Sequence, residues 1–220
     1  MIKVKKLLKS NFAAWDTFVL RANNGTIFHL RDFLNYHPKN RFKDFSLEFH
    51  KNNNLLSVIP AAVVLKNNKK LFVSHPGASF ASFVTKEDFS IKDSFEVVEK
   101  LIKYTKSEGF DGIQLKTPPA FYSKRISNYI EYALLSSGFN YLNREVTSTL
   151  FIEENEDAIL KKFKSSHSRA VRKSQNLGVE IKITDKVDEF FLMLEKNLKI
   201  RNVHLTVNQG IIYCCSAREI

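Results

Sequence analysis

Residues 42–74 read FKDFSLEFHKNNNLLSVIPAAVVLKNNKKLFVS. Apolar and polar residues alternate through residues 42–50, which is the period of a strand with one buried face. An Asn-Asn-Asn turn leads into a second, longer apolar run over residues 55–65, and Asn67-Asn68 connects that run to a third over residues 70–74. The stretch therefore predicts a three-stranded antiparallel meander.

The segments on either side of the meander show a mixture of helical and strand patterns. Apolar residues spaced three and four apart predict helices, and Asn, Gly or Pro residues follow and end them. The predicted helices cover residues 12–22, 30–36, 90–107 and 126–136, and further strands cover residues 2–8, 112–115 and 141–152. This order predicts an α/β protein, α+β in the stricter usage, with a mixed, mostly antiparallel sheet and helices on both faces.

A second series of elements begins after residue 152. We expect a helix over residues 158–177, a strand over 179–183 and a helix over 187–200. The chain is therefore divided into a first domain of residues 1–152 and the start of a second unit over residues 153–203. Residues 204–220 show no periodicity, and we expect an irregular tail of the kind that a frameshift or truncation leaves.

The chain is strongly basic, with 34 Lys and Arg against 23 Asp and Glu and a formal net charge of +11. Such a field attracts phosphates, nucleic acids and acidic membrane surfaces. The plainest interpretation is the solvated surface of a soluble protein. The alternative is an anionic partner such as a sugar nucleotide, coenzyme A or a tRNA.

The cysteines and the apolar segments of the sequence indicate the cellular compartment of the protein. The two cysteines, Cys214 and Cys215, are adjacent, and no Cys or His spacing fits a metal site. The basic first residues lack the apolar run of a signal peptide, and the longest apolar run, residues 55–65, is too short to span a membrane. We therefore expect a cytoplasmic protein in a reducing setting, with no metal ion and no membrane span.

The most specific segment for function is the basic stretch KSSHSRAVRKS, residues 164–174. On a helix, His167 falls on the apolar face, where a packing role is favoured over that of a base, and Arg169, Arg172 and Lys173 fall outside that face. The guanidinium group of arginine can donate two parallel hydrogen bonds to a phosphate, whereas the ammonium group of lysine attracts it only as a point charge. These three cations are candidate phosphate contacts, and a solvated basic face is the alternative.

Three local segments carry a family resemblance. The first is W-x-x-F-V-x-x-A-x-x-G-x-I-F over residues 15–28, continued by Phe33-Leu34-x-Tyr36-His37. The second is SHPGASF over residues 74–80, and the third is the basic stretch followed by Gly178-Val179. Together they resemble the N-terminal half of Fem-type acyltransferases of the GNAT superfamily, over roughly residues 1–203. The element order predicted above is also similar to the GNAT arrangement.

The resemblance implies an N-acyltransferase. Such an enzyme moves an acyl or aminoacyl group from acyl-CoA or aminoacyl-tRNA to an amine of a cell-wall or polysaccharide precursor carried on a nucleotide or lipid. It implies that Arg169, Arg172 and Lys173 contact the precursor's phosphate, and that His75 and Gly77 line a loop near the donor's phosphates. That loop has one glycine and lacks the usual GNAT phosphate-loop pattern, and no catalytic residue is assigned.

Two further expectations complete the prediction. Tyr122, which follows the strand at residues 112–115, is a candidate substrate contact, although the prolines before it also serve simply to end the strand. The family continues through a complete second unit, so we expect that a partner or a dimer supplies the missing half. The alternative functions are a non-catalytic basic module that binds an anionic partner such as tRNA, and an inactive truncated product.

Overall fold

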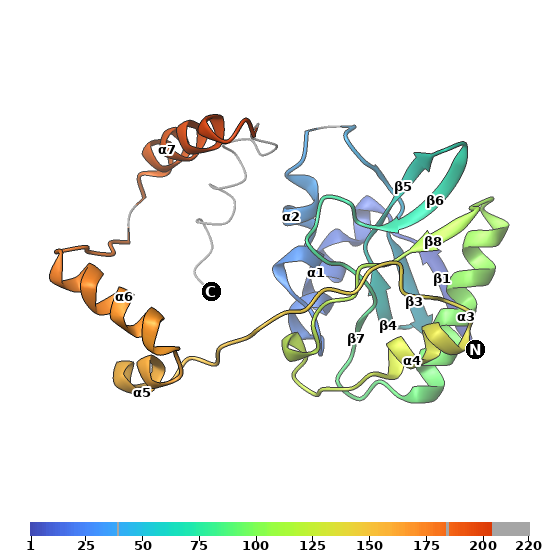
Figure 1. Cartoon of the computed structure of the whole chain (residues 1–220). Coiled ribbons are helices and arrows are strands. Elements are labelled where there is room, and N and C mark those ends of the chain that lie inside the picture. The colour runs from blue at the N-terminus through green and yellow to red at the C-terminus, as the bar shows by residue number, and fades with distance from the viewer. Residues whose placement is uncertain (39, 184, 204–220) are drawn as a thin grey trace. The chain divides into compact units, whose positions relative to one another are not determined.

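The computed structural model describes residues 1–38, 40–183 and 185–203 (Figure 1). Contacts between residues separate this part of the chain into two compact units, with the boundary between Asn140 and Tyr141. The first unit carries both β-sheets, whereas the second consists of helices joined by irregular chain. The predicted boundary after residue 152 stays a prediction, and the predicted irregular tail lies outside the described residues.

The predicted meander is present, but its first two strands are each bent into two shorter ones. β2 (Lys43–Asp44) and β3 (Leu47–Lys51) are separated at residues 45–46, and β4 (Asn54–Ile59) and β5 (Ala61–Lys66) are separated at Pro60. Proline has no N–H for a strand ladder, so the second bend falls where regular pairing is interrupted. The bends lie beside each other, because the Phe45 amide donates to the Ala61 carbonyl oxygen at 2.7 Å.

The bent strands contribute to two four-stranded sheets. The first has the order β1 (Ile2–Lys6), β3, β4, β7 (Val84–Thr85), and all of its pairs are antiparallel. The second has the order β2, β5, β6 (Lys69–Ser74), β8 (Gly112–Gln114), and its β6–β8 pair is parallel. The mixed, mostly antiparallel arrangement predicted from the sequence is therefore confirmed, and β7 is an additional strand too short to show a pattern.

Helices cover both faces of the first sheet. Ile59 belongs to the larger core, which includes Leu101 of α3 (Ile91–Ser107) and Ala133 of α4 (Tyr129–Ser136). Its neighbour Val58 faces the other way, as alternation along a strand requires, and packs in a second cluster with Trp15 of α1 (Phe12–Arg21). The shorter helical segments are η1 (Lys9–Asn11), η2 (Ile27–His29), α2 (Arg31–Asn35) and η3 (Ala120–Tyr122).

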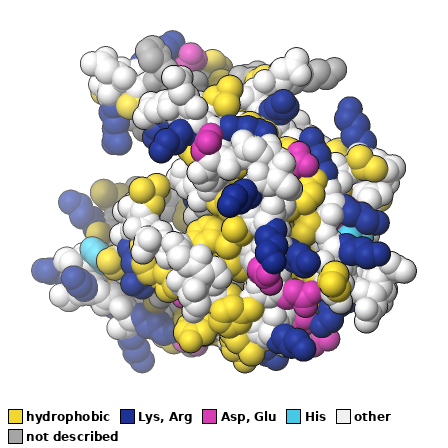
Figure 2. All heavy atoms as spheres, turned by 90° about the vertical axis from the view of Figure 1, so that its right-hand side faces the viewer, with side chains coloured by type: hydrophobic (Ala, Val, Ile, Leu, Met, Phe, Trp, Pro, Cys, Tyr) yellow, Lys and Arg dark blue, Asp and Glu magenta, His cyan; other side chains and the backbone are white. Residues whose placement is uncertain are grey.

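The crossover helix α3 is well determined by its sequence. Its N-cap residue Ser90 accepts a hydrogen bond from the Asp93 amide at 3.0 Å, which satisfies a donor left free at the helix start. Figure 2 shows the side of the molecule that carries α3 and α4, where hydrophobic side chains lie exposed among Lys and Arg side chains. Phe95 of α3 and Tyr132 of α4 make an edge-on ring contact there, with centroids 6.0 Å apart.

The second unit contains α5 (Glu156–Lys161), α6 (Ser165–Asn176) and α7 (Val187–Ile200). α7 has the predicted bounds, whereas the helix predicted over residues 158–177 is interrupted at residues 162–164. The strands predicted over residues 141–152 and 179–183 are not formed, and both segments are exposed. No strand in the described residues pairs with either segment. Because a strand needs hydrogen bonds from a neighbouring strand, the alternating pattern alone does not make these segments form strands.

None of the helices in the described part of the chain has the length and apolar character needed to cross a bilayer.

Candidate functional site

An ion pair between a buried arginine and a half-buried aspartate lies at the two strand bends and defines one side of the candidate site. Arg31, at the start of α2, is 3% exposed, and its Nη2 lies 3.3 Å from Asp44 Oδ2. Its Nη1 donates to Ser46 Oγ at 3.0 Å, and the Ser46 hydroxyl donates to Asp44 Oδ1 at 2.6 Å. A further bond from Nη2 to Asn35 Oδ1, at 3.2 Å, helps to offset the cost of burying the charge.

Gly77 lies between two imidazole rings. Its carbonyl oxygen is 3.2 Å from His37 Nε2, and its amide donates to His75 Nδ1 at 3.4 Å. The two rings are nearly parallel, with an angle of 14° between their planes and 6.1 Å between their centroids. A Cβ atom at residue 77 would lie 1.8 Å from His37 Nε2, so this approach depends on glycine. We call this arrangement the Gly77 clamp.

Both histidines of the Gly77 clamp are held in the neutral form at neutral pH. Burial lowers the pKa of His75 to about 4; Asp44 opposes this shift, while Arg31 and His37 reinforce it. Burial also lowers the pKa of His37, against its hydrogen bond to the Gly77 carbonyl. His37 is the more exposed of the two rings, since His75 is 2% exposed, but its Nε2 faces the Gly77 carbonyl oxygen and its Nδ1 is buried.

The His75–Gly77 loop does not have the geometry expected of a phosphate-binding loop. The His75 amide donates to the Pro60 carbonyl at 3.2 Å, and the Ala78 amide donates to the His75 carbonyl at 3.0 Å. The next α-helix begins only at Ile91, so no helix N-terminus lies at the loop. Donor contact by His75 and Gly77 stays a prediction.

Aromatic side chains border the same loop. The ring of Phe80 lies 5.1 Å from the ring of Tyr122, which is 44% exposed in η3. The Ala81 amide donates to the Lys116 carbonyl at 2.9 Å, which joins the chain leaving β6 to the chain leaving β8. The structure therefore brings Tyr122 to the end of β6 where the Gly77 clamp begins. Contact between Tyr122 and a substrate stays a prediction.

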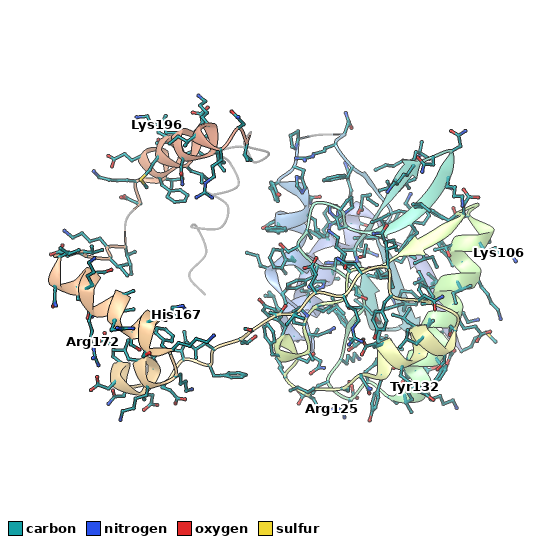
Figure 3. The ribbon with its side chains drawn as sticks, viewed as in Figure 1. Lys106, Arg125, Tyr132, His167, Arg172 and Lys196 are labelled. Atoms are coloured by element: carbon teal, nitrogen blue, oxygen red, sulfur yellow. The ribbon has the colours of Figure 1, made fainter. Side chains whose placement is uncertain are left out.

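The three predicted phosphate contacts, Arg169, Arg172 and Lys173, are exposed side chains of α6 in the second unit. Figure 3 labels Arg172 and His167 on this helix. α6 has no acidic residue, and none of the salt bridges found in the described residues involves these cations. His167 is also exposed, and α6 buries no residue. The packing or hydrogen-bonding role predicted for His167 stays a prediction.

Sequence reasoning missed two central residues of this site. His37 belongs to a stretch that carries the family resemblance but is not among the predicted site residues, and the sequence did not single out Arg31. Arg31 lies 13 and 15 residues from its partners Asp44 and Ser46, and His37 lies 40 residues from Gly77. No local spacing joins these positions. Among the described residues, no group of three or more His, Cys, Asp or Glu side chains is placed to hold a metal ion.

Comparison with known proteins supports the fold. No protein-family model and no curated protein sequence matches the chain. The crystal structure of FemX matches with a TM-score of 0.61 and 16% identity over 96% of this chain, which spans 53% of the FemX chain. A GNAT family acetyltransferase from Staphylococcus aureus shows 12% identity over 68% of this chain and 98% of its own, with a TM-score of 0.42. At 16% identity the FemX match establishes the fold alone, and this is the Fem-like fold that the sequence predicted.

Proposed function

We propose that the protein is an N-acyltransferase acting on a cell-wall or polysaccharide precursor. The observation that carries the proposal is the FemX fold, which extends over 96% of this chain. The donor would be acyl-CoA or an aminoacyl-tRNA, and the acceptor an amine on a nucleotide- or lipid-linked sugar or peptide. The chain spans 53% of the FemX chain, and we place the activity in the cytoplasm.

The proposed reaction needs little from the protein beyond positioning and proton removal. The acceptor amine attacks the carbonyl carbon of the donor, a C–N bond forms, and the thioester C–S or ester C–O bond breaks. The electron pair leaves with the sulfur or the ribose oxygen, and a proton passes from the amine through a base to that leaving group. His37 is not assigned as that base, because its Nε2 donates to the Gly77 carbonyl oxygen at 3.2 Å and its Nδ1 is buried without a hydrogen-bond partner among the described residues.

Phosphate recognition would come from α6. Arg169 and Arg172 lie three residues apart on one helix and have no salt-bridge partner among the described residues, so their guanidinium groups are available for a phosphate. Lys173 adds a third positive charge next to them. A precursor carried on a nucleotide or lipid diphosphate supplies the matching anion.

The test is calorimetric titration of the full chain with acetyl-CoA, a UDP-linked amino sugar and a generic tRNA, each at low and at physiological salt. The expected result is saturable binding of one small ligand that persists at physiological salt. Arg169→Ala should weaken that binding about tenfold. Arg21→Ala, which removes an exposed arginine at the end of α1, is the control and should leave it unchanged.

A basic binding module is the second candidate, and the absence of acidic residues from α6 favours it. Such a module binds nucleic acid through released counterions, so its affinity falls steeply as salt rises. Binding to tRNA alone, lost at physiological salt and weakened equally by Arg169→Ala and Arg21→Ala, would support this candidate against the enzyme. An absence of all binding would identify an inactive product.

A further inference from the structure

A second group of cations lies on the edge strand of the first sheet, away from the Gly77 clamp. The antiparallel register of β1 and β3 places Lys3 opposite His50 and Lys5 opposite Glu48. Side chains alternate across a strand, so these four residues share one face, and Phe49 points to the opposite face and into the core. Because β1 is the first strand of its sheet, this face continues to the sheet edge.

The surface is hollowed at this position. A depression of about 400 Å³ is lined by Met1, Lys3, Lys5, His50, Asn52 and Asn53. Asn52 and Asn53 form the turn between β3 and β4, with φ angles of 51° and 63°. Asparagine tolerates this left-handed region better than most residues, which allows a tight turn beside the depression.

The depression presents donors and positive charge. Lys3 and Lys5 are exposed, and none of the salt bridges of the described residues involves either one. The adjacent carboxylate, Glu48, is 2% exposed. Its Oε2 accepts from Asn11 Nδ2 at 3.2 Å and lies 3.4 Å from His50 Nε2. Glu48 is thus hydrogen-bonded beneath the surface, while Lys3, Lys5 and the two asparagines line the depression.

We propose that this depression binds a small phosphate-bearing molecule, a phosphomonoester or a diphosphate. Ammonium groups and carboxamide N–H groups donate to phosphate oxygens, and Lys3 and Lys5 stand two residues apart on the same strand face. The volume leaves room for a group attached to the phosphate. The site uses the first sheet, whereas the Gly77 clamp follows β6 of the second sheet, so this inference does not rest on the proposed acyl transfer.

Edge protection is the competing explanation for these lysines. Charged side chains on an edge strand discourage pairing with the edge of another molecule. That role requires charge but neither a hollow nor an asparagine turn beside it. It predicts aggregation when the charges are removed and no saturable binding of a small anion, so the two explanations can be separated.

The test is titration of the full chain with inorganic phosphate, pyrophosphate and glycerol 3-phosphate at physiological salt, with acetate as a carboxylate. The variant is Lys3→Gln/Lys5→Gln. The matched control is Lys66→Gln/Lys69→Gln, which removes two exposed lysines that face each other across β5 and β6. We expect saturable binding of a phosphate compound by the wild type and the control, and about tenfold weaker binding by the variant.

Three outcomes would overturn the proposal. Equal weakening in the variant and the control would show that the net charge, and not the depression, attracts the anion. Acetate binding as tight as that of phosphate would exclude a phosphate site, and an absence of saturable binding to the wild type would leave edge protection. Amide shifts measured by NMR during the phosphate titration provide a second readout, and they should centre on Lys3, His50 and Asn52.

Discussion

Gly77 shows how a missing side chain creates a contact. The family resemblance of the SHPGASF segment implied His75 and Gly77 as site residues, and a simple Pro-Gly turn, which can be recognised locally, was the alternative. The reason for the glycine could not be predicted, since the ring that occupies the space of its Cβ belongs to His37, 40 residues away. Contacts of that range depend on how the strands bend, and local periodicity carries no information about it.

Gly77→Ala should lower the free energy of unfolding by about 1–3 kcal/mol, because the new Cβ must displace the His37 ring or the loop. The same substitution should cost much less in a His37→Ala background, where the ring is absent. Urea denaturation of the wild type, both single variants and the double variant measures the coupling. An equal cost in both backgrounds would show that the loop, and not the His37 contact, requires glycine.

At the scale of elements, Asn23 connects the end of α1 to the chain before α4. Its Oδ1 accepts from the Arg125 amide at 2.7 Å, its Nδ2 donates to the Arg125 carbonyl at 3.0 Å, and its own carbonyl accepts from the Lys124 amide at 2.9 Å. The predicted end of this helix at residue 22 is confirmed to within one residue, as α1 ends at Arg21. The cross-connection over 102 residues could not be predicted from that motif.

Asn23→Ala should release the Lys124–Arg125 segment, because the side chain supplies two of its hydrogen bonds. Trypsin cleaves after lysine and arginine, so limited proteolysis followed by mass spectrometry should show faster cleavage at these two positions. Asn128→Ala is the control, since Asn128 lies in the same part of the chain and makes no side-chain cap to α4. Equal cleavage rates in both variants would contradict the role given to Asn23.

Helices were predicted more reliably than strands, for a reason that lies in their hydrogen bonds. α3 and α7 satisfy their backbone groups within one segment, and apolar spacing placed both within a residue of their observed bounds. Residues 141–152 and 179–183 have strand-like composition, but a strand needs a partner to form its ladder. Without such a partner among the described residues, both segments lack the predicted strands.

For the whole molecule, buried imidazoles make stability depend on pH. Burial lowers the pKa of His29 and of His75 to about 4 in the folded protein, whereas an unfolded chain titrates near 6.5. Between these values the unfolded state binds more protons, so the free energy of unfolding should decrease as pH falls from about 6.5 to about 4. The loss should be at most roughly 3 kcal/mol for each ring.

Urea denaturation between neutral pH and pH values near 4 measures this dependence. The variant His75→Gln lacks one of the two rings and should show a shallower decrease than the wild type over the same interval. The comparison is made on the slopes, since the substitution also changes packing and shifts the whole curve. Parallel curves for the two proteins would show that His75 does not contribute to the loss.

The two bent strands have a consequence for how the first unit comes apart. One continuous segment contributes β2 to the second sheet and β3 to the first, and the next contributes β4 to the first sheet and β5 to the second. The two segments are hydrogen-bonded at their bends, where the Phe45 amide donates to the Ala61 carbonyl oxygen. Neither sheet can lose its ladder without loosening backbone on which the other depends. The two sheets therefore form a single cooperative unit, and their amide protons should exchange with solvent through one shared opening event.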